Sequence, residues 1–441
     1  YLCFTLNNCL FLYLTRIVML LLLISLALSA SYVVGSDICN DILDVAIIGS
    51  GPGGLSAAIA LHHITSLSKV VVYERASAFR PIGAALGLDT LAYDTLKEFG
   101  MDLHDRVRSV GSNSQWQVLQ RPSGEIIYDN ESFLANTDFN WLAWYNLQTA
   151  LRVAAEAEAV AGGILIQLSS KLVDFEEDEE AGIVRLYFAD GRVVKTRILI
   201  GADGYNSIVR GKTVGDGKPV FTGTMTWRGV MDRSHFNKIV KIEPFKSMDD
   251  GVNLSIVGDA KNFCVMDCGE GKIAWTGTAI YNSENSVDKH APTNIKALNV
   301  FKNWPPIVKT LIEATDASAI VESGVYDREP VSSWGALEGK FKRTTLLGDA
   351  AHPIRPSLGL GSTLAFQDSK CFANNLSGVD LGNTEKVATA LKLYEKERID
   401  VTTPLQKKAG KEGEESHAEN RADTMKVFLE ASLANKKKTT H

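Results

Sequence analysis

Residues 43–54 read LDVAIIGSGPGG, and this segment carries the strongest structural signal in the chain. Its first half is almost entirely apolar, which is typical of a parallel strand covered on both faces. Its second half is a G-x-G-x-x-G turn, and residues 55–64 continue with helical spacing. Residues 69–74 then predict a second strand. The segment therefore opens a β-α-β unit.

The glycines of this turn, Gly49, Gly51 and Gly54, predict a binding site for a dinucleotide. They permit a tight turn and a close approach of the backbone to a pyrophosphate, whose charge is met by the N-terminus of the following helix. Glu74 closes the second strand, where a carboxylate can accept hydrogen bonds from ribose hydroxyls. We include the adjacent Arg75 among the cofactor-binding candidates. A chance glycine turn is the weaker alternative, because strand, helix and acidic residue all stand in their expected places.

A second segment, residues 201–210, reads GADGYNSIVR and follows a predicted hairpin at residues 183–200. The Asp-Gly pair inside that hairpin supplies the positive φ angles that a tight turn needs. Asp203 follows the strand end and is a candidate to hold a cofactor hydroxyl, although such a tetrapeptide alone is more often a simple turn. Arg210 lies one or two turns into the next helix, either near phosphates or on a solvated face.

The third segment, residues 348–361, reads GDAAHPIRPSLGLG after a buried strand at residues 343–347. Gly348 and Asp349 directly follow that strand, which places the carboxylate to bind a ribityl hydroxyl. The loop then brings backbone N–H groups and a helix N-terminus to the ligand, and these favour negative charge there. Its cofactor-binding candidates are Gly359, Leu360 and Gly361.

His352 and Pro353 lie inside the third segment and are the candidates for a catalytic role. A histidine can act as an acid or a base near neutral pH. The alternative is a hydrogen-bonded structural residue in a rigid loop, and the sequence favours that alternative.

Residues 221–280 alternate apolar with polar or small residues between turn signals, which predicts an antiparallel sheet with one wet or ligand-facing side. Trp227 and Arg228 in this region are the candidate substrate contacts. Tryptophans in such a sheet are otherwise core residues, and the same holds for Trp275 and Trp334.

The three segments, in this order, resemble the group A FAD-dependent monooxygenases, especially the salicylate hydroxylase-like and zeaxanthin epoxidase-like branch. The resemblance covers about residues 43–398. It implies an α/β fold with a Rossmann-like FAD-binding domain of the p-hydroxybenzoate hydroxylase type, an inserted antiparallel β-sheet domain for substrate, and C-terminal helices. The expected boundaries are 41–105, 140–215 and 325–380 for the FAD-binding domain, 106–139 and 216–324 for the substrate domain, and 381–441 for the C-terminal helical region.

The resemblance also implies a function. One FAD would be reduced by NADPH or NADH, which binds transiently, and would react with O2 through a flavin C4a-hydroperoxide. One oxygen atom would pass to an aromatic or polyene, carotenoid-like substrate by hydroxylation or epoxidation. In such chemistry the protein supplies orientation and excludes water.

Three positions depart from the family pattern. Trp144 stands where the family usually has an arginine, Leu360 where it has a glutamine, and Gln367 where it has a glutamate. Two alternatives are open, and these changes, together with the possible N-terminal anchor, motivate the first of them. One is a catalytically impaired flavin-fold protein that acts as a binding or assembly subunit, and the other is a flavin oxidase or dehydrogenase.

Charge and the N-terminal region limit partners and location. The formal net charge of -6 gives no general attraction to nucleic acid, and we find no metal-binding pattern. Residues 17–34 are uncharged and end in small residues, so residues 1–40 predict a signal peptide or an N-terminal membrane anchor. The expected location is the secretory or endomembrane route, with membrane association through residues 17–34. The oligomeric state is open.

Overall fold

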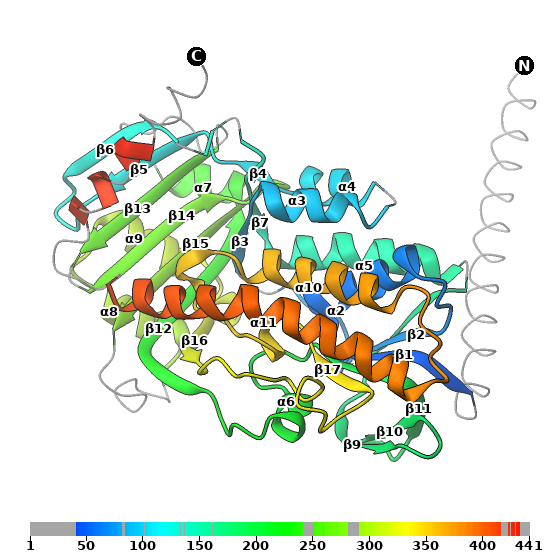
Figure 1. Ribbon diagram of the computed structural model, residues 1–441. Coiled ribbons are helices and arrows are strands. Elements are labelled where there is room, and N and C mark those ends of the chain that lie inside the picture. The colour runs from blue at the N-terminus through cyan, green and yellow to red at the C-terminus, as the bar shows by residue number, and fades with distance from the viewer. Residues whose placement is uncertain are drawn as a thin grey trace, which may run out of the picture.

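The computed structural model describes residues 41–432 apart from 82–83, 101, 133, 136, 161, 241–250, 259, 281–290, 416–421, 424 and 428. The predicted leader or anchor, residues 1–40, lies outside the described residues. Within the described part of the chain, no helix has both the length and the apolar character needed to cross a membrane. Figure 1 shows two sheets side by side, one flanked by long helices and one with shorter helices.

The first sheet collects the apolar strands that the sequence predicts. Strand β1 is buried along most of its length and pairs in parallel with β2 and β11, while β10 and β11 form the expected antiparallel hairpin. The strand order is β8-β2-β1-β11-β10-β9, and β17 pairs with β11 off this path. Its strands are β1 (Ile42–Ile48), β2 (Val70–Tyr73), β8 (Ile164–Gln167), β9 (Leu172–Asp178), β10 (Ile183–Phe188), β11 (Val193–Gly201) and β17 (Thr344–Leu346).

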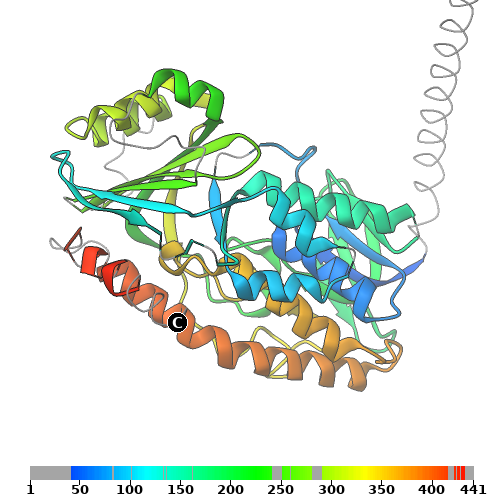
Figure 2. The same cartoon turned by 90° about the horizontal axis from the view of Figure 1, so that it is seen from above.

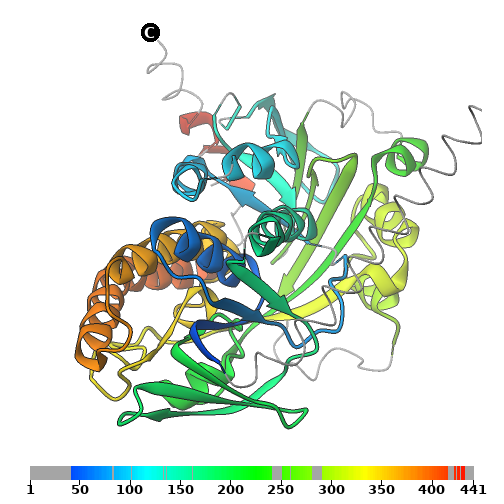
Figure 3. The same cartoon turned by 90° about the vertical axis from the view of Figure 1, so that its right-hand side faces the viewer.

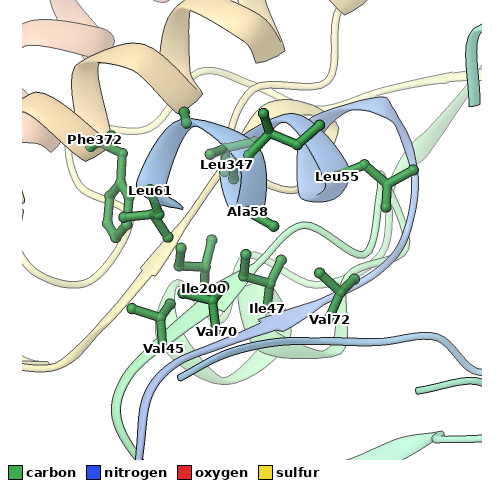
Figure 4. Close-up of a cluster of buried hydrophobic side chains, with 14 of the residues drawn as sticks. Val45, Ile47, Leu55, Ala58, Leu61, Val70, Val72, Ile200, Leu347 and Phe372 are labelled. Atoms are coloured by element: carbon green, nitrogen blue, oxygen red, sulfur yellow. The ribbon is translucent and has the colours of Figure 1, made fainter. Parts of the chain in front are cut away.

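Helix α2 is the centre of the first core. Its side chains Leu55, Ala58 and Leu61 point at the strands β1, β2 and β11 below it, and Phe372 and Leu347 also join the cluster (Figure 4). Full burial of such aliphatic side chains contributes roughly 1.5–3 kcal/mol each. On its other side α2 packs against α10, where the hydroxyls of Ser56 and Ser369 are 2.8 Å apart.

The remaining helices of this body close its faces and edges. Helices α10 and α11 lie side by side (Figure 3), with α10 packed on α2 and α11 in contact with β17, and Pro404 is inside α11. A small sheet joins the body to the second sheet and has the order β3-β7-β4. These elements are α2 (Pro52–Ile64), β3 (Ala85–Leu88), α3 (Thr90–Lys97), α4 (Leu103–Ser109), β4 (Ser112–Asn113), β7 (Asn140–Ala143), α5 (Trp144–Val160), α6 (Ile208–Thr213), η4 (Gly348–Ala350), η5 (Pro356–Leu358), α10 (Gly361–Leu376) and α11 (Thr384–Glu415).

The second sheet confirms the antiparallel region predicted at residues 221–280, with β5 added in parallel to β13. Its order is β16-β12-β15-β14-β13-β5-β6. The strands are β5 (Trp116–Gln120), β6 (Ile126–Glu131), β12 (Val220–Asp232), β13 (Val252–Gly258), β14 (Lys261–Asp267), β15 (Lys272–Ile280) and β16 (Val321–Asp327). The elements between them are α7 (Arg233–Ile239), α8 (Thr293–Val300), α9 (Pro306–Ala314) and η3 (Ala317–Ala319).

The two faces of the second sheet have different neighbours. On one face, a core that includes Trp227, Phe263 and Trp275 packs against α8 and α9. On the other face, Met266 and Ala274 pack against residues of β3 and β7, so this face looks towards the first body. Figure 2 shows the short helices on one side of this sheet and the first body with its long C-terminal helix on the other.

Candidate functional site

The three sequence segments meet at one edge of the first sheet. Ile48 of β1 is in register with Gly201 of β11, and Gly201 is in register with Leu346 of β17. Backbone bonds continue the alignment beyond the strands, since Ala202 N donates to Ile48 O at 2.8 Å and Leu347 N donates to Gly201 O at 2.9 Å. Residues that are far apart in sequence are therefore neighbours at the carboxyl ends of three parallel strands, where α/β sheets bind ligands.

Each glycine of the first turn is needed for a different structural reason. Gly49 has φ of 106°, and a Cβ there would lie 2.4 Å from the carbonyl oxygen of Ala202. A Cβ on Gly54 would lie 1.9 Å from the carbonyl oxygen of Gly49. A Cβ on Gly51 would have no described atom within 4 Å, so this glycine faces open space at the start of α2. Two glycines thus allow close packing, and the third leaves room for a phosphate at the positive end of a helix.

Glu74 is bound to the same turn. Its Oε2 accepts hydrogen bonds from the backbone N–H and the hydroxyl of Ser50, at 3.1 and 2.7 Å, and its Oε1 accepts from Ala76 N at 2.8 Å. A carboxylate oxygen has two lone pairs, so a ribose hydroxyl can still donate to it. Arg75 is exposed beside it. Gln148 on α5, which the sequence reasoning missed, donates to Ser50 O at 2.9 Å and holds the turn from the other side.

Among the described residues, Asp349 is the carboxylate of the site that accepts no hydrogen bond from the protein. Within the described part of the chain it accepts no hydrogen bond, and its side chain is exposed. The surrounding protein nevertheless desolvates the carboxyl and raises its pKa. The exposure of Asp349 and its raised pKa are compatible when the carboxylate oxygens face solvent and protein atoms surround the rest of the group. A partly desolvated carboxylate that accepts no hydrogen bond from the described residues fits a ligand that brings hydroxyl groups.

The loop after Asp349 presents backbone to the same place. Gly359 has φ of 65°, and a Cβ there would have no described atom within 4 Å. A Cβ on Gly361 would lie 3.9 Å from Oδ1 of Asp349, and α10 begins at Gly361. The N–H groups of the first turn of α10 have no partner within the helix, and this end of the helix favours negative charge. Together with Gly51, these features fit the diphosphate, ribityl chain and flavin ring of FAD.

Asp203 mainly organises its own turn. Its Oδ1 accepts from the Ser207 hydroxyl at 2.5 Å and its Oδ2 from Ile208 N at 2.7 Å, which stabilises the start of α6. Burial raises the pKa of Asp203, although these hydrogen bonds act in the opposite direction. Its contact with a cofactor stays a prediction.

Arg210 corrects an expectation from the sequence, because it lies neither at a solvated face nor at a helix face open to phosphates. Its side chain is fully buried. Its Nη1 donates to the carbonyl oxygens of Ala350 and Ala351, at 3.1 and 2.5 Å, and its Nη2 is 2.8 Å from Oδ2 of Asp216. Arg210 therefore ties the second segment to the third and holds the backbone next to Asp349.

His352 belongs to a buried network. Its Nε2 is 2.6 Å from Oδ2 of Asp368, and the same carboxylate accepts from Gly348 N at 2.9 Å and from Nε of Arg398 at 2.6 Å. Burial alone would raise the pKa of Asp368, but the charges and hydrogen bonds of His352 and Arg398 outweigh it and lower that pKa to about 2. Gln406 donates to Pro353 O at 3.0 Å. A catalytic role for His352 and Pro353 stays a prediction, and this geometry favours a structural one.

The two candidate substrate residues lie on opposite faces of β12, because successive side chains of a strand alternate. Trp227 is fully buried in the core with α8 and α9, and its indole N–H donates to Oε2 of Glu322 at 3.2 Å. This corrects the grouping of Trp227 with the substrate contacts. Arg228 is half-buried on the other face, towards the first body.

Arg228 has only neutral partners among the residues that the structure describes. Its Nη2 donates to the hydroxyls of Thr226 and Ser323, at 3.0 and 2.7 Å, and no carboxylate is paired with it. Burial lowers the pKa of its guanidinium. A partly desolvated cation without an anion is suited to bind an acidic or strongly polar group of a ligand.

The three departures from the family pattern lie at the start of α5 and on α10. Trp144 is the half-buried first residue of α5, one helical turn before Gln148 and on the same face. Leu360 caps α10, and Gln367 is half-buried on that helix. Among the described residues, no cluster of histidine, cysteine and acidic side chains could hold a metal ion.

Comparison with known proteins gives a family match. Residues 42–409 match the family described as "FAD binding domain". The chain is 30% identical over 339 residues to the aurachin C monooxygenase/isomerase of Stigmatella aurantiaca, covering 76% of this chain and 81% of that protein. It is 28% identical over 369 residues to the chloroplastic zeaxanthin epoxidase of Nicotiana plumbaginifolia, covering 81% of this chain but only 52% of that longer protein.

A solved structure shows the same fold. The Klebsiella pneumoniae protein HpxO, in a complex with FAD and uric acid, superposes with a TM-score of 0.69 at 22% identity. The match covers 89% of this chain and 93% of that one. The arrangement of two sheets described above is therefore that of an FAD-binding protein.

Proposed function

The chain belongs to the FAD-binding-domain family and is an FAD-dependent monooxygenase of group A, and from that premise we propose what its residues do and what it acts on. FAD is its cofactor and NAD(P)H the usual reductant of the family. When bound, FAD supplies the redox chemistry that activates oxygen. The protein's own residues bind and orient the cofactor and the substrate, and they exclude water from the site.

The observation that carries this proposal is the unpartnered carboxylate of Asp349 between the glycine turn and the start of α10. Asp349 would accept hydrogen bonds from the ribityl hydroxyls, and the open backbone at Gly51 would receive the diphosphate. The N–H groups at the start of α10 would stabilise negative charge on the flavin ring. Arg210 and Asp368 would keep these groups in place through the contacts described above.

We propose that the substrate is a small organic molecule with an oxygen-bearing polar group, such as a phenol. Arg228 supports this, because it lies on the sheet face towards the first body and lacks a carboxylate partner in the described structure. A charge-assisted hydrogen bond from Arg228 to a phenolate or carbonyl oxygen would orient the substrate.

Anaerobic reduction tests the proposal. The protein reconstituted with FAD is mixed with NADPH or NADH, with and without a panel of phenols and carotenoid-like compounds, and flavin absorbance is followed. We expect one nicotinamide to bleach the flavin and a substrate to accelerate the bleaching. In a parallel aerobic assay the same substrate should accelerate oxygen uptake. A protein that binds no FAD would support the assembly-subunit alternative. Flavin that is reduced by substrate without a nicotinamide would support the oxidase or dehydrogenase alternative.

We also propose entry into the secretory or endomembrane route through residues 17–34, with membrane association if that segment is retained. Support comes only from the uncharged run and the small residues at its end. Fusing residues 1–40 to a fluorescent reporter tests it, and a diffuse reporter signal in the cytosol would contradict it.

A further inference from the structure

One row of side chains crosses the second sheet on the face that looks towards the first body. The strand registers align Arg228 with Thr276, Thr276 with Cys264, Cys264 with Ser255, Ser255 with Leu119, and Leu119 with Tyr128. Neighbouring strands are about 4.8 Å apart, so the four steps from Arg228 to Leu119 span roughly 19 Å. This is much longer than a single aromatic ring.

The chemistry of the row changes from one end to the other. It begins at the guanidinium of Arg228 and continues over the small side chains of Thr276, Cys264 and Ser255. Arg228, Thr276 and Cys264 are half-buried, so a ligand can reach them, whereas Ser255 is buried. The row ends at the side chain of Leu119 and the aromatic ring of Tyr128, and both residues are buried.

The apolar end is covered by the chain's own C-terminal residues. Ala422, Met425 and Leu429 form one hydrophobic cluster with Leu119, Tyr128 and Val257. Arg121 adds an ion pair, with its Nη2 at 2.6 Å from Oδ1 of Asp423. Figure 1 shows this last helical piece, in red, beside β5 and β6.

The alternation of side chains along β13 and β5 shows which face of the second sheet the C-terminal residues cover. Val252, Leu254 and Ile256 face the core with α8 and α9, so Ser255 and Val257 face the other way. The same argument separates Val118 from Leu119. The C-terminal residues therefore lie on the same face of the sheet as Arg228.

We propose that this face binds an elongated amphiphilic substrate, with its polar head at Arg228 and its apolar tail ending against Ala422, Met425 and Leu429. The inference rests on the proposed function, since it names the substrate class of the same site. The cation selects a phenolate or carbonyl oxygen, and the small side chains in the middle of the row match a narrow chain better than a broad ring system. The C-terminal wall limits the length of that chain.

Equilibrium binding to the holoenzyme tests the proposal without turnover. The probes are para-alkylphenols from methyl to dodecyl, and binding is measured by the perturbation of flavin absorbance. We expect affinity to increase about fourfold for each added methylene until the tail reaches the wall, and then to stop increasing. In Leu429→Ala the tail length at which affinity stops increasing should become longer, and in Ala422→Leu it should become shorter.

Two further variants complete the test. Val427→Ala alters a side chain on the same segment that is 64% exposed, and it should leave the length profile unchanged. Arg228→Gln should lower the affinity for every phenol by a similar factor, about tenfold, because it removes only the charged contact to the head group. Flavin content and thermal stability are measured for each variant, so a misfolded protein is recognised.

The outcomes separate the two proposals. An identical length profile in the parent, Leu429→Ala and Ala422→Leu proteins, with flavin content preserved, would overturn the C-terminal wall. Loss of affinity in Arg228→Gln only for the longest tails would overturn the placement of the head group. A shifted profile without any flavin reduction by NADPH or NADH would support the wall while rejecting monooxygenase function.

Discussion

The carboxylate of Asp368 lies 2.6 Å from Nε2 of His352, and both side chains are almost completely buried. Asp368 comes from α10, and its other oxygen is bound by Arg398 of α11. Through the N–H of Gly348 the same carboxylate also holds the start of the third segment. One buried group thus connects the loop of the cofactor site to both helices behind it, and a buried charge that is so paired is costly to disturb.

His352→Asn tests whether this histidine is structural or catalytic. We expect the free energy of unfolding to fall by about 1–3 kcal/mol, because Asp368 loses a charge-assisted partner. The pH profile of kcat/KM should keep its shape. The lowered pKa of Asp368 gives stability that is present above its ordinary value of 3.8 and is lost as pH falls through about 2. Without His352 the folded-state pKa of Asp368 should rise towards its ordinary value, so this contribution to stability becomes smaller and is completely lost at a higher pH.

The checks are thermal unfolding from pH 2 to pH 7 and steady-state kinetics across pH. His235→Asn is the matched control, since His235 is exposed. Disappearance of one limb of the kcat/KM profile in His352→Asn, with stability intact, would show that His352 acts as an acid or base.

Asp349→Asn should separate cofactor binding from stability. Hydrogen bonds to a charged acceptor contribute roughly 1.5–3 kcal/mol, so FAD affinity should fall by about tenfold or more. Without cofactor the variant should be at least as stable as the parent. The pKa of Asp349 is raised in the folded state, so the stability linked to this carboxyl is present at low pH and is lost as pH rises through the raised value.

FAD titration by fluorescence and apoprotein melting at several pH values measure both effects. Asp400→Asn, at an exposed position of α11, is the control and should change neither. Unaltered FAD affinity in Asp349→Asn would remove this carboxylate from the site.

Gly51→Ala and Gly54→Ala form a pair with opposite expectations. A Cβ at Gly54 meets the Gly49 carbonyl at 1.9 Å, so this variant should lose about 3 kcal/mol of stability or more. A Cβ at Gly51 has open space and ordinary backbone angles, with φ of -69° and ψ of 177°. Gly51→Ala should therefore fold normally but bind FAD less tightly, because the methyl group occupies the approach to the diphosphate. Differential scanning calorimetry of the apoprotein measures the stability of each variant, and FAD titration measures its affinity. Equal changes of both quantities in the two variants would contradict the expectation.

Trp144→Arg tests whether the departure at the start of α5 weakens the site. Trp144 shares a helix face with Gln148, which is bonded to the glycine turn. An arginine there should tighten FAD binding by about fivefold, the effect of roughly 1 kcal/mol from a partly exposed charge near phosphates. Tyr145→Arg places the same charge on a different face of the helix and should have little effect. Equal affinities in all three proteins would place Trp144 out of reach of the cofactor.

The fold was predictable where its signals are local. The apolar run of β1, the glycine pattern after it and the hairpin at β10 and β11 each need only neighbouring residues to be recognised. The meeting of Gly49, Asp203 and Asp349 was expected from the family resemblance, which assigns the three segments to one FAD. The structure shows the physical reason, since parallel strands share one carboxyl edge.

The buried polar partners were not predictable, because they depend on tertiary contacts. Glu395 on α11 looks like one of many charges on a solvated helix, yet it is fully buried. It accepts hydrogen bonds from the N–H groups of Trp334, Ala336 and Leu337 and from the hydroxyl of Thr345. Likewise, nothing local distinguishes the buried Arg210 from an exposed one. Alternation along β12 separates Trp227 from Arg228, but only the packing of α8 and α9 decides which face is the core.

The order of the segments along the chain also governs how the enzyme is made. Strands β1, β11 and β17 lie together, yet Gly54 and Gly348 are separated by about 300 residues, which takes roughly 15–60 s to synthesise at about 5–20 residues per second. During that time the edge of β11 that pairs with β17 has no partner strand, and only part of the cofactor site exists. We therefore expect flavin loading to be a late event that needs β17 in place. A nascent chain stalled before β17 would expose the edge of β11, and an exposed strand edge favours aggregation.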